Sequence, residues 1–330
     1  MAASGVDATQ CRIVAGNLIW NDIVGRTNYG VERLPVMLRR VRAGLIKTSA
    51  TPVFERLSDT TRRLDGDNGF GQFVGECAIA SAIEMAKTHG TGIVGVWNSN
   101  FFGTGAYFVE KAAEKGMIAL VLSNSFPKVA AEGGLRPVLG TNPFAFGGPR
   151  KNGRSLLVDM STASLAGSTI REKIRTGGSL AEGLVIDDKG QPLTDPVKAG
   201  KGTLLPAAGA KGFGLALMVE MLSAVLTGAG ISKEVGSIYN DFDRTGNNGH
   251  FFLVLDIKRW MTLDEYYTRF ETLIAMIKAS GDDGDVLLPG EARWNMREKN
   301  LVEGIAIEAE TLNGLETLAA EFGIKPPWIT

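Results

Sequence analysis

Hydrophobic and polar positions along the chain change near residue 90 from helical spacing to short apolar runs. Helical spacing occurs over about residues 6–24 and 31–43, and again over 76–90, where Gly90 suits a helix end. Short apolar runs with polar exits predict strands at TGIVGVWNS (91–99), MIALVLSNS (117–125) and RSLLVDMSTAS (154–164). Strands that end in Ser, Asn and Asp are typical of ligand sites at the edge of a sheet.

The pattern continues through the C-terminal half of the chain. The amphipathic helix AYFVEKAAEKG separates the first two strands, and a helix over 212–228 and the strand HFFLVLDI follow. Helices return in TLDEYYTRFETLIAMIKASG, which opens with Thr262 and Glu265 in capping-box spacing, and near 309–322. We therefore expect a sheet domain over residues 91–255 and a discontinuous helical domain from residues 1–90 and 256–330.

Composition narrows the class of protein. The chain has 330 residues, 44% hydrophobic and 22% charged, which is typical of a globular protein long enough for two domains. A net charge of −1 provides no global field for nucleic acid or an anionic membrane, so we expect neither as a partner. The start, MAASGVDATQC, lacks the basic and apolar regions of a signal peptide, and we predict a cytoplasmic protein.

The cysteines, the histidines and the longest apolar segment have ordinary structural interpretations. Cys11 and Cys77 lie far apart without a CxxC pair, and we expect buried free thiols. His89 and His250 have no partner at ligand spacing, so we expect no metal site. The segment GFGLALMVEMLSAVLTGAG is about as long as a membrane span, but Glu220 near its centre would be costly there. We predict a buried core helix.

The glycine-rich segments do not match the nucleotide-binding fingerprints. GFGQFVG is one residue too long for GxGxxG, and in GTGAYF Phe108 stands where the third glycine would be. Lys211 lies between Ala210 and Gly212, so it forms no GxxxxGK[ST] phosphate loop. GxSxG, HExxH and CxxC motifs do not occur either. A Rossmann fold, a P-loop, nucleophile-elbow chemistry and metal hydrolysis are thus unsupported.

Five segments, in order along the chain, carry a resemblance to one known family. They are GTNPFAFGGP (140–149), VDMSTAS (158–164), GQPLTDP (190–196), GAKGFGLALMVEMLSAVLTGA (209–229) and LLPGE (287–291). Together they resemble the malate/L-lactate dehydrogenase family, which includes sulfolactate and ureidoglycolate dehydrogenases, diketogulonate reductase and piperideine-2-carboxylate reductases. The resemblance runs from about Gly5 to Ile324. Each motif is weak alone, whereas the five in this order are specific.

The resemblance implies a fold, an activity and an assembly. The family's α/β fold is not Rossmann: a mixed, largely antiparallel sheet binds the nicotinamide cofactor, and helices from both chain ends form the second domain. Members transfer a hydride between NADH or NADPH and C2 of a 2-oxo acid, or of a cyclic 2-imino acid, and are usually homodimers. We therefore expect an NAD(P)-dependent oxidoreductase whose substrate is a small 2-oxo or 2-imino carboxylate, with the choice of NAD or NADP left open.

The resemblance also implies which loops meet the cofactor. The SNSFP and TNP loops approach the nicotinamide and the diphosphate, the loop after the third strand lies along the cofactor, and the PGE loop closes over it. Hydroxyl and backbone N–H groups donate to phosphate oxygens, and an ammonium supplies a point charge. Taken singly, TNP is a common turn, and Lys211 is a solvated helix-start lysine. The cofactor-binding residues implied are Ser125, Thr141, Asn142, Pro143, Asp159, Met160, Ser161, Thr162, Ala163, Lys211, Gly290 and Glu291.

The chain departs from the family at its acid/base positions. The family has Ser-His-Gly followed by an arginine and a tyrosine, and the aligned residues here are Asn28, Tyr29, Gly30, Arg33 and Met37. Tyr29 thus stands in place of the histidine that acts as proton donor. In NSNFFG, Phe101 stands in place of a second family histidine. Both acid/base histidines are therefore replaced.

Tyr29 and Arg33, in the stretch RTNYGVERLP, are the candidates for chemistry. A phenol with a pKa of about 10 donates a proton but is a poor base at pH 7 unless a cation such as Arg26, Arg33 or Lys128 lowers that pKa. The Arg33 guanidinium offers a two-pronged grip on a carboxylate. The predicted catalytic set is Tyr29 as provisional proton donor, Asn28, Arg33, and Arg244 as a second carboxylate contact from a partner subunit.

Two classes of function and the choice of cofactor stay open at the level of sequence. The cofactor motifs and Arg33 favour an enzyme, whereas the loss of both histidines favours a family member that binds cofactor or ligand without turnover. An iminium substrate is already positively charged, so its reduction forms no oxyanion, and Phe101 and Met37 would make the pocket more apolar for a cyclic substrate. The candidates for recognising the 2′-phosphate of NADP are Ser164, Arg171 and Lys173.

Overall fold

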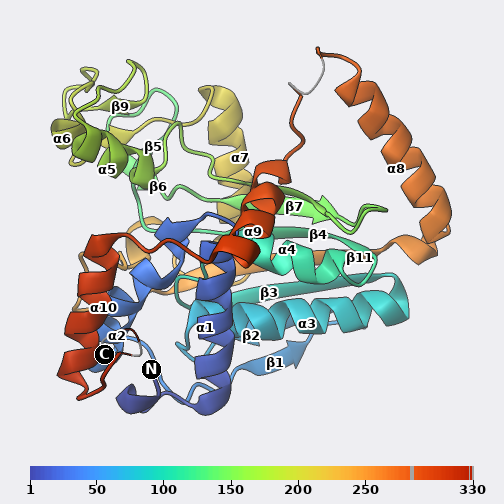
Figure 1. Ribbon diagram of the computed structural model, residues 1–330, viewed down its shortest axis with the longest axis horizontal. Coiled ribbons are helices and arrows are strands. Elements are labelled where there is room, and N and C mark those ends of the chain that lie inside the picture. Colours follow the sequence, from blue (N-terminus) through green and yellow to red (C-terminus); the bar gives the residue numbers. More distant parts are fainter. Residues whose placement is uncertain (283–285, 327, 329–330) are drawn as a thin grey trace.

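The computed structural model describes residues 1–282, 286–326 and 328, and its centre is a seven-stranded sheet (Figure 1). The strands run in the order β1-β2-β3-β11-β4-β7-β8. Every neighbouring pair is antiparallel except β2 and β3, which confirms the mixed, largely antiparallel sheet. The strands are β1 (Val53–Arg56), β2 (Thr61–Asp65), β3 (Thr91–Ser99), β11 (Asn248–Asp256), β4 (Met117–Ser123), β7 (Phe144–Gly148) and β8 (Leu156–Met160).

The middle of the sheet consists of strands that the apolar runs predict. Strand β11 lies between β3 and β4, so both of its edges are paired. Val94 on β3 and Phe252 and Val254 on β11 are fully buried. The predicted strands at 91–99 and 117–125 and in HFFLVLDI are confirmed, and the third run, RSLLVDMSTAS, holds the shorter strand β8.

Strands β1 and β2 lie within residues 1–90, where only helices were expected. All residues of β1 are exposed, and β2 carries two arginines in TRRLD, so neither strand has an apolar run that would reveal it. Because β2 pairs with β3, the main sheet extends across residue 90. The division into a helical and a sheet domain at that residue stays a prediction.

Two helices cover the main sheet. Helices α3 (Gly71–His89) and α4 (Gly105–Ala113) pack on its strands, α3 against β3 and β11 and α4 against β4 and β7. The approach of α3 is close, because a Cβ atom at Gly92 would lie 2.0 Å from the carbonyl oxygen of Ala82. This packing encloses the largest apolar core of the described residues, which includes Phe108 and Phe252.

Helices from the two chain ends pack together, as the family resemblance implies. Helix α9 contacts α1, and α10 contacts α2 (Figure 1). The Asn300 side chain of α9 donates to the backbone carbonyls of Asp22 and Ile23 at the end of α1. These helices are α1 (Ala8–Ile23), α2 (Leu34–Arg42), α9 (Glu291–Glu303) and α10 (Ala309–Glu321).

A second, smaller sheet forms a separate lobe that the sequence did not reveal. Its strands run in the order β6-β5-β10-β9, and two helices pack beside them (Figure 1). Val129, Ile170, Val185 and Leu204 belong to its own apolar core. The elements are β5 (Val129–Ala130), β6 (Pro137–Leu139), β9 (Val185–Ile186), β10 (Thr203–Leu204), α5 (Gly167–Thr176) and α6 (Pro196–Ala199).

The expected buried core helix is wrong for the single chain. Helix α7 (Ala210–Glu220) continues into a π-helical turn, η4 (Met221–Val225), and one side of the pair is open to solvent. Met221 is 62% exposed, Val225 64% and Leu226 66%, while Val219 and Ala224 on the other side are buried. None of the helices that the structure describes is long and apolar enough to cross a membrane.

Helix α8 (Leu263–Lys278) extends away from the main sheet (Figure 1). Its predicted capping box is confirmed, because the Thr262 hydroxyl accepts from the Glu265 N–H and the Glu265 carboxylate accepts from the Thr262 N–H. Both cysteines are free, as expected, but they are half-buried rather than fully buried.

Candidate active site

A cavity of about 900 Å³ lies where the main sheet, the smaller sheet and the chain-end helices meet. Its volume is within the range of small-molecule and cofactor sites. Most of the residues predicted from sequence line this one cavity, although they come from segments far apart in the chain. They are Asn28, Tyr29, Arg33, Ser125, Thr141, Pro143, Asp159, Met160, Ser161 and Arg244.

The loop that carries Tyr29 and Arg33 is held against the end of α1. It consists of two 3₁₀ turns, η2 (Thr27–Tyr29) and η3 (Val31–Arg33), on either side of Gly30. The Asp22 carboxylate accepts the Val31 N–H at 2.9 Å, and a Cβ at Gly30 would lie 1.9 Å from Asp22 Oδ1. A side chain at this position would therefore displace the Asp22 carboxylate from its contact with Val31. Burial raises the pKa of Asp22 to about 6.

Arg33 is fixed at the cavity wall by contacts within its own loop. Its Nε donates to the Asn28 carbonyl at 2.6 Å, and Nη1 lies 3.3 Å from the Glu32 carboxylate. The guanidinium lies over the Tyr239 ring, 5.2 Å from its centroid. The side chain is only 7% exposed. A guanidinium held in this way is preorganised for an anionic group in the cavity.

Tyr29 stacks on Phe101 inside the cavity, with ring centroids 6.0 Å apart and an interplanar angle of 11°. Burial raises the pKa of the Tyr29 phenol, and the charges of Asp159 and Tyr239 raise it further, whereas Arg33 and Arg26 lower it. Tyr29 is thus protonated at neutral pH, which suits a proton donor and not a base.

Lys128, also considered as a cation beside the phenol, lines the cavity and donates to the Gly200 carbonyl at 3.1 Å. Burial lowers the pKa of this ammonium group. Arg244 forms an ion pair with Asp241 at 2.6 Å and donates to the Lys233 carbonyl, so a residue of its own chain already holds the guanidinium. The predicted contact of Arg244 with a partner subunit stays a prediction.

Sequence reasoning missed Arg293, a buried cation in the cavity wall. Its Nη2 lies 2.9 Å from Asp159 Oδ2, and the side chains of Arg293 and Asp159 are 7% and 9% exposed. The other terminal nitrogen, Nη1, is buried and has no hydrogen-bond partner among the residues that the structure describes. Burial lowers the pKa of Arg293, while Asp159 opposes that effect. Its only sequence signal is that it follows LLPGE by two residues.

The two predicted phosphate loops are tied together by Asn142. This residue is fully buried with a positive φ of 33°, and its Oδ1 accepts the Ser125 N–H at 3.2 Å. Its Nδ2 donates to the Glu220 carboxylate at 2.7 Å. The Ser125 hydroxyl in turn accepts the Thr141 N–H at 3.0 Å. Asn142 therefore organises the loops, while the Ser125 and Thr141 side chains face the cavity.

The remaining predicted residues lie outside the cavity lining. Lys211 is exposed at the start of α7, and Gly290 packs beside Leu157. Glu291 binds Lys278 at 2.6 Å and lies 3.7 Å from Arg150. Their cofactor roles stay predictions, as do those of Thr162 and Ala163, which are buried beside the loops.

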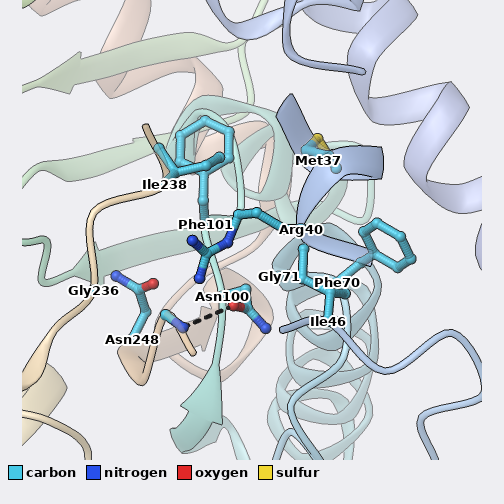
Figure 2. A pocket seen from close by; sticks show the side chains of 11 residues that line it. Met37, Arg40, Ile46, Phe70, Gly71, Asn100, Phe101, Gly236, Ile238 and Asn248 are labelled. Atoms are coloured by element: carbon cyan, nitrogen blue, oxygen red, sulfur yellow. Dashed lines mark hydrogen bonds between the residues drawn. The ribbon is translucent and has the colours of Figure 1, made fainter. Parts of the chain in front are cut away.

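A small second cavity of about 20 Å³ lies behind the first, and Figure 2 shows its lining. Met37 lines this cavity and not the larger one, so the expectation that Met37 makes the substrate pocket more apolar is wrong. Phe101 lines both cavities. Arg40 reaches into the same region from α2 (Figure 2) and donates to the backbone carbonyls of Ser237 and Arg244, which fixes a segment of the larger cavity's wall.

His250 is a structural residue of β11 below the cavity. Its ring is fully buried between hydroxyls, with Nδ1 2.8 Å from Ser123 Oγ and Nε2 3.0 Å from Ser99 Oγ. It also stacks on Phe102. Burial lowers its pKa to about 3, so it is neutral and cannot replace the missing acid. Among the described residues, no group of three or more His, Cys, Asp or Glu could hold a metal ion.

Comparisons with known proteins agree with the arrangement of the whole chain. A sequence model of the malate/L-lactate dehydrogenase family matches residues 1–316. Malate/(S)-sulfolactate dehydrogenase of Methanothermus fervidus is 33% identical over 327 residues, which cover 99% of this chain and 95% of the relative. The structure of sulfolactate dehydrogenase from Methanocaldococcus jannaschii superimposes with a TM-score of 0.91 at 33% identity, covering 98% of this chain and 94% of the other.

A second type of enzyme has the same fold. The structure of delta1-piperideine-2-carboxylate reductase from Pseudomonas syringae superimposes with a TM-score of 0.88 at 31% identity and covers 96% of this chain and 95% of the other. The chain is therefore similar along nearly its whole length both to dehydrogenases and to a reductase.

Proposed function

The chain belongs to the malate/L-lactate dehydrogenase family and is an NAD(P)-dependent oxidoreductase, and we propose that its reaction takes place in the large cavity around Tyr29 and Arg33. The reaction is hydride transfer to or from C2 of a 2-oxo or 2-hydroxy acid, or of a cyclic 2-imino acid. The observation that carries this assignment is the meeting of Arg33, Tyr29, Asp159, Ser125 and Thr141 in one cavity.

Arg33 anchors the substrate carboxylate. Its Nε is used by the Asn28 carbonyl and Nη1 also lies 3.3 Å from the Glu32 carboxylate. Because each terminal nitrogen carries two N–H groups, Nη1 and Nη2 can still donate to two carboxylate oxygens in the cavity. The ring of Tyr239 below the guanidinium and the buried position limit its motion. A carboxylate held here places its neighbouring C2 beside Tyr29.

Tyr29 donates the proton when the substrate is a ketone. Hydride addition to a ketone leaves negative charge on oxygen, and a half-buried phenol that stays protonated can neutralise it. In the reverse direction a protonated phenol cannot act as base, so we expect kcat for oxidation of the 2-hydroxy acid to be low at neutral pH and to rise with pH. A protonated cyclic imine needs no such donor, because the hydride converts it directly into a neutral amine.

The wall of the same cavity fits a dinucleotide. Hydroxyls of Ser125 and Thr141 and the cations Lys128 and Arg171 are donors for phosphate oxygens. The nicotinamide supplies or accepts the hydride when bound. Of the three residues considered for the 2′-phosphate of NADP, only Arg171 lines the cavity, and Ser164 Oγ is used by the Leu184 carbonyl. Arg171 is therefore the proposed site of that discrimination.

The exposed apolar side of α7 and η4 supports a homodimer. Met221, Val225 and Leu226 are each more than three-fifths exposed in the single chain, and a second copy of this chain would remove them from water. Replacing both Met221 and Val225 by Asp should shift the protein from dimer to monomer in sedimentation measurements. A wild-type monomer would contradict the proposal. A cytoplasmic location stays a prediction.

A kinetic panel tests the proposed function. NADH and NADPH oxidation is followed with 2-oxo acids and cyclic 2-imino acids for wild type, Arg33→Gln, Arg33→Lys and the matched control Arg12→Gln, whose arginine is exposed on α1. Loss of two charged hydrogen bonds should lower kcat/KM on the order of 100-fold in both Arg33 variants. Equal activity of Arg33→Gln and Arg12→Gln would refute the anchor.

A further inference from the structure

The unpartnered nitrogen of Arg293 is an unexplained feature of the cavity. Nη2 is bound to Asp159, but Nη1 is buried in a side chain that is 7% exposed and has no hydrogen-bond partner within the described part of the chain. A buried donor without an acceptor costs free energy, so an acceptor that enters the cavity beside Nη1 would be stabilised there. Arg293 lines the cavity that also holds Tyr29 and Asp159.

We propose that Arg293 is a positioning residue for proton transfer, which holds the negative charge left on the Tyr29 oxygen after the phenol has donated its proton. The proposal deepens the function assigned above and rests on Tyr29 being the donor. The proposal also explains the ion pair with Asp159. Asp159 fixes the position of the Arg293 guanidinium, and Arg293 neutralises the Asp159 carboxylate, which would otherwise repel a phenolate at Tyr29.

Several charged or titratable groups line the cavity around Tyr29. Asp159 from the end of β8, Tyr239 from the segment after η5 (Ser232–Glu234), and Arg26 and Arg33 from the flanks of its own turn all affect the pKa of Tyr29. Arg293 comes from α9 and lines the same cavity as Tyr29. Asp159 and Tyr239 oppose a phenolate, whereas Arg26 and Arg33 favour it. Arg33 donates to the Asn28 carbonyl and pairs with Glu32, and the proposed function assigns its remaining N–H groups to the substrate carboxylate. Arg293 therefore supplies the buried cation with a nitrogen to spare.

The proton step balances without a further reactant. As the hydride forms a bond to C2 of a 2-oxo acid, the electron pair of the C=O bond moves to oxygen, which takes the proton of the Tyr29 O–H. The phenolate that remains lies with the Arg293 guanidinium until water returns a proton. A protonated cyclic imine has no oxyanion, so its reduction should be indifferent to Arg293.

The kinetic test uses Arg293→Gln, Arg293→Lys, Tyr29→Phe and the double variant Arg293→Gln/Tyr29→Phe. Arg297→Gln is the matched control, since Arg297 lies one turn further along α9 and pairs with Glu110 at 2.6 Å. With a 2-oxo acid, Arg293→Gln should lower kcat on the order of 100-fold with KM changed less than about threefold. Arg293→Lys should restore part of the loss. The double variant should be no slower than Tyr29→Phe, because both changes remove one step.

Three kinetic results would overturn the proposal. A rise in KM at constant kcat would make Arg293 a substrate-binding residue, and additive losses in the double variant would separate it from Tyr29. Equal losses on ketone and imine substrates would do the same, since only the ketone needs the proton.

A spectroscopic test works without turnover and so separates this proposal from the proposed function. The ultraviolet absorbance of phenolate is titrated with pH, and the Tyr29→Phe variant is subtracted to isolate Tyr29. Arg293→Gln should raise the Tyr29 pKa by about one or more, because an opposite charge is lost and Asp159 is left unneutralised. An unchanged pKa would refute the proposal even if the enzyme turns over, and a raised pKa would support it even if no substrate is found.

Discussion

Replacing Asp22 by Asn should change how the stability of the protein depends on pH. Asp22 is 4% exposed, and its carboxylate accepts the Val31 N–H below the loop that carries Tyr29. Its pKa is raised from 3.8 to about 6, chiefly by burial, with Glu32 adding to the effect and the Val31 hydrogen bond opposing it. Asn keeps the shape and an acceptor oxygen but removes the titration.

The sign and the size of the effect follow from linkage. A carboxyl group with a raised pKa binds more protons in the folded than in the unfolded state, so folding stability falls as pH rises between about 4 and 6. The two pKa values differ by about two, and since each whole step in pKa corresponds to about 1.4 kcal/mol, the full loss is about 3 kcal/mol. About half of this loss in folding stability takes place between pH 5 and pH 8, because the other half is complete below pH 5.

Denaturation with urea at pH 5, 6, 7 and 8 measures this directly. The free energy of unfolding of Asp22→Asn minus that of wild type should grow by about 1.5 kcal/mol from pH 5 to pH 8. Asp188→Asn, at an exposed loop position, is measured beside it as the control variant. A flat difference for Asp22→Asn would refute the inference that burial has raised this pKa.

Two further predictions concern packing and thiol chemistry. Gly30→Ala should abolish most turnover and lower Tm, because the new Cβ would collide with Asp22, whereas Gly16→Ala, with open space around it inside α1, should raise stability by about 1 kcal/mol in thermal unfolding. In a Cys11→Ser background, Cys77 should react with a neutral alkylating reagent at pH 8 on the order of 100-fold more slowly than free cysteine, because burial raises its pKa to about 11; an equal rate would contradict this.

The sequence predicted the elements whose apolar pattern decides their structure. Strand β11 and helix α3 bury continuous or periodic apolar residues, and both were recognised. Strand β1 buries no apolar residue. Backbone hydrogen bonds hold it against β2, together with polar pairs such as Arg63 with Glu55 at 2.6 Å. The apolar segment that contains α7 was recognised as a helix. Which side of this helix faces water depends on the elements that pack against it, and the local sequence pattern does not identify those elements.

Prediction of the candidate site succeeded and failed for related reasons. Tyr29, Arg33 and Asp159 lie in segments with a family motif, and the fold brings them to one cavity. Arg293 lies 134 residues from its partner Asp159 and has no motif of its own, so only the packing of α9 reveals it. Asn142 was correctly placed in a loop beside the cavity. Its buried side chain, however, bonds to the Ser125 N–H and to Glu220 and so connects the loops instead of facing the cavity.

The most direct measurement of the central claim follows the hydride itself. NADH and NADPH carrying deuterium at the transferable C4 position are incubated with the protein and with 2-oxo acids or cyclic 2-imino acids, and the products are examined by mass spectrometry and NMR. Our account predicts one deuterium at C2 of the product, with little of it formed by Arg33→Gln. Tight binding of the reduced cofactor without transfer to any of these substrates would contradict the account and favour a protein that binds ligand without turnover.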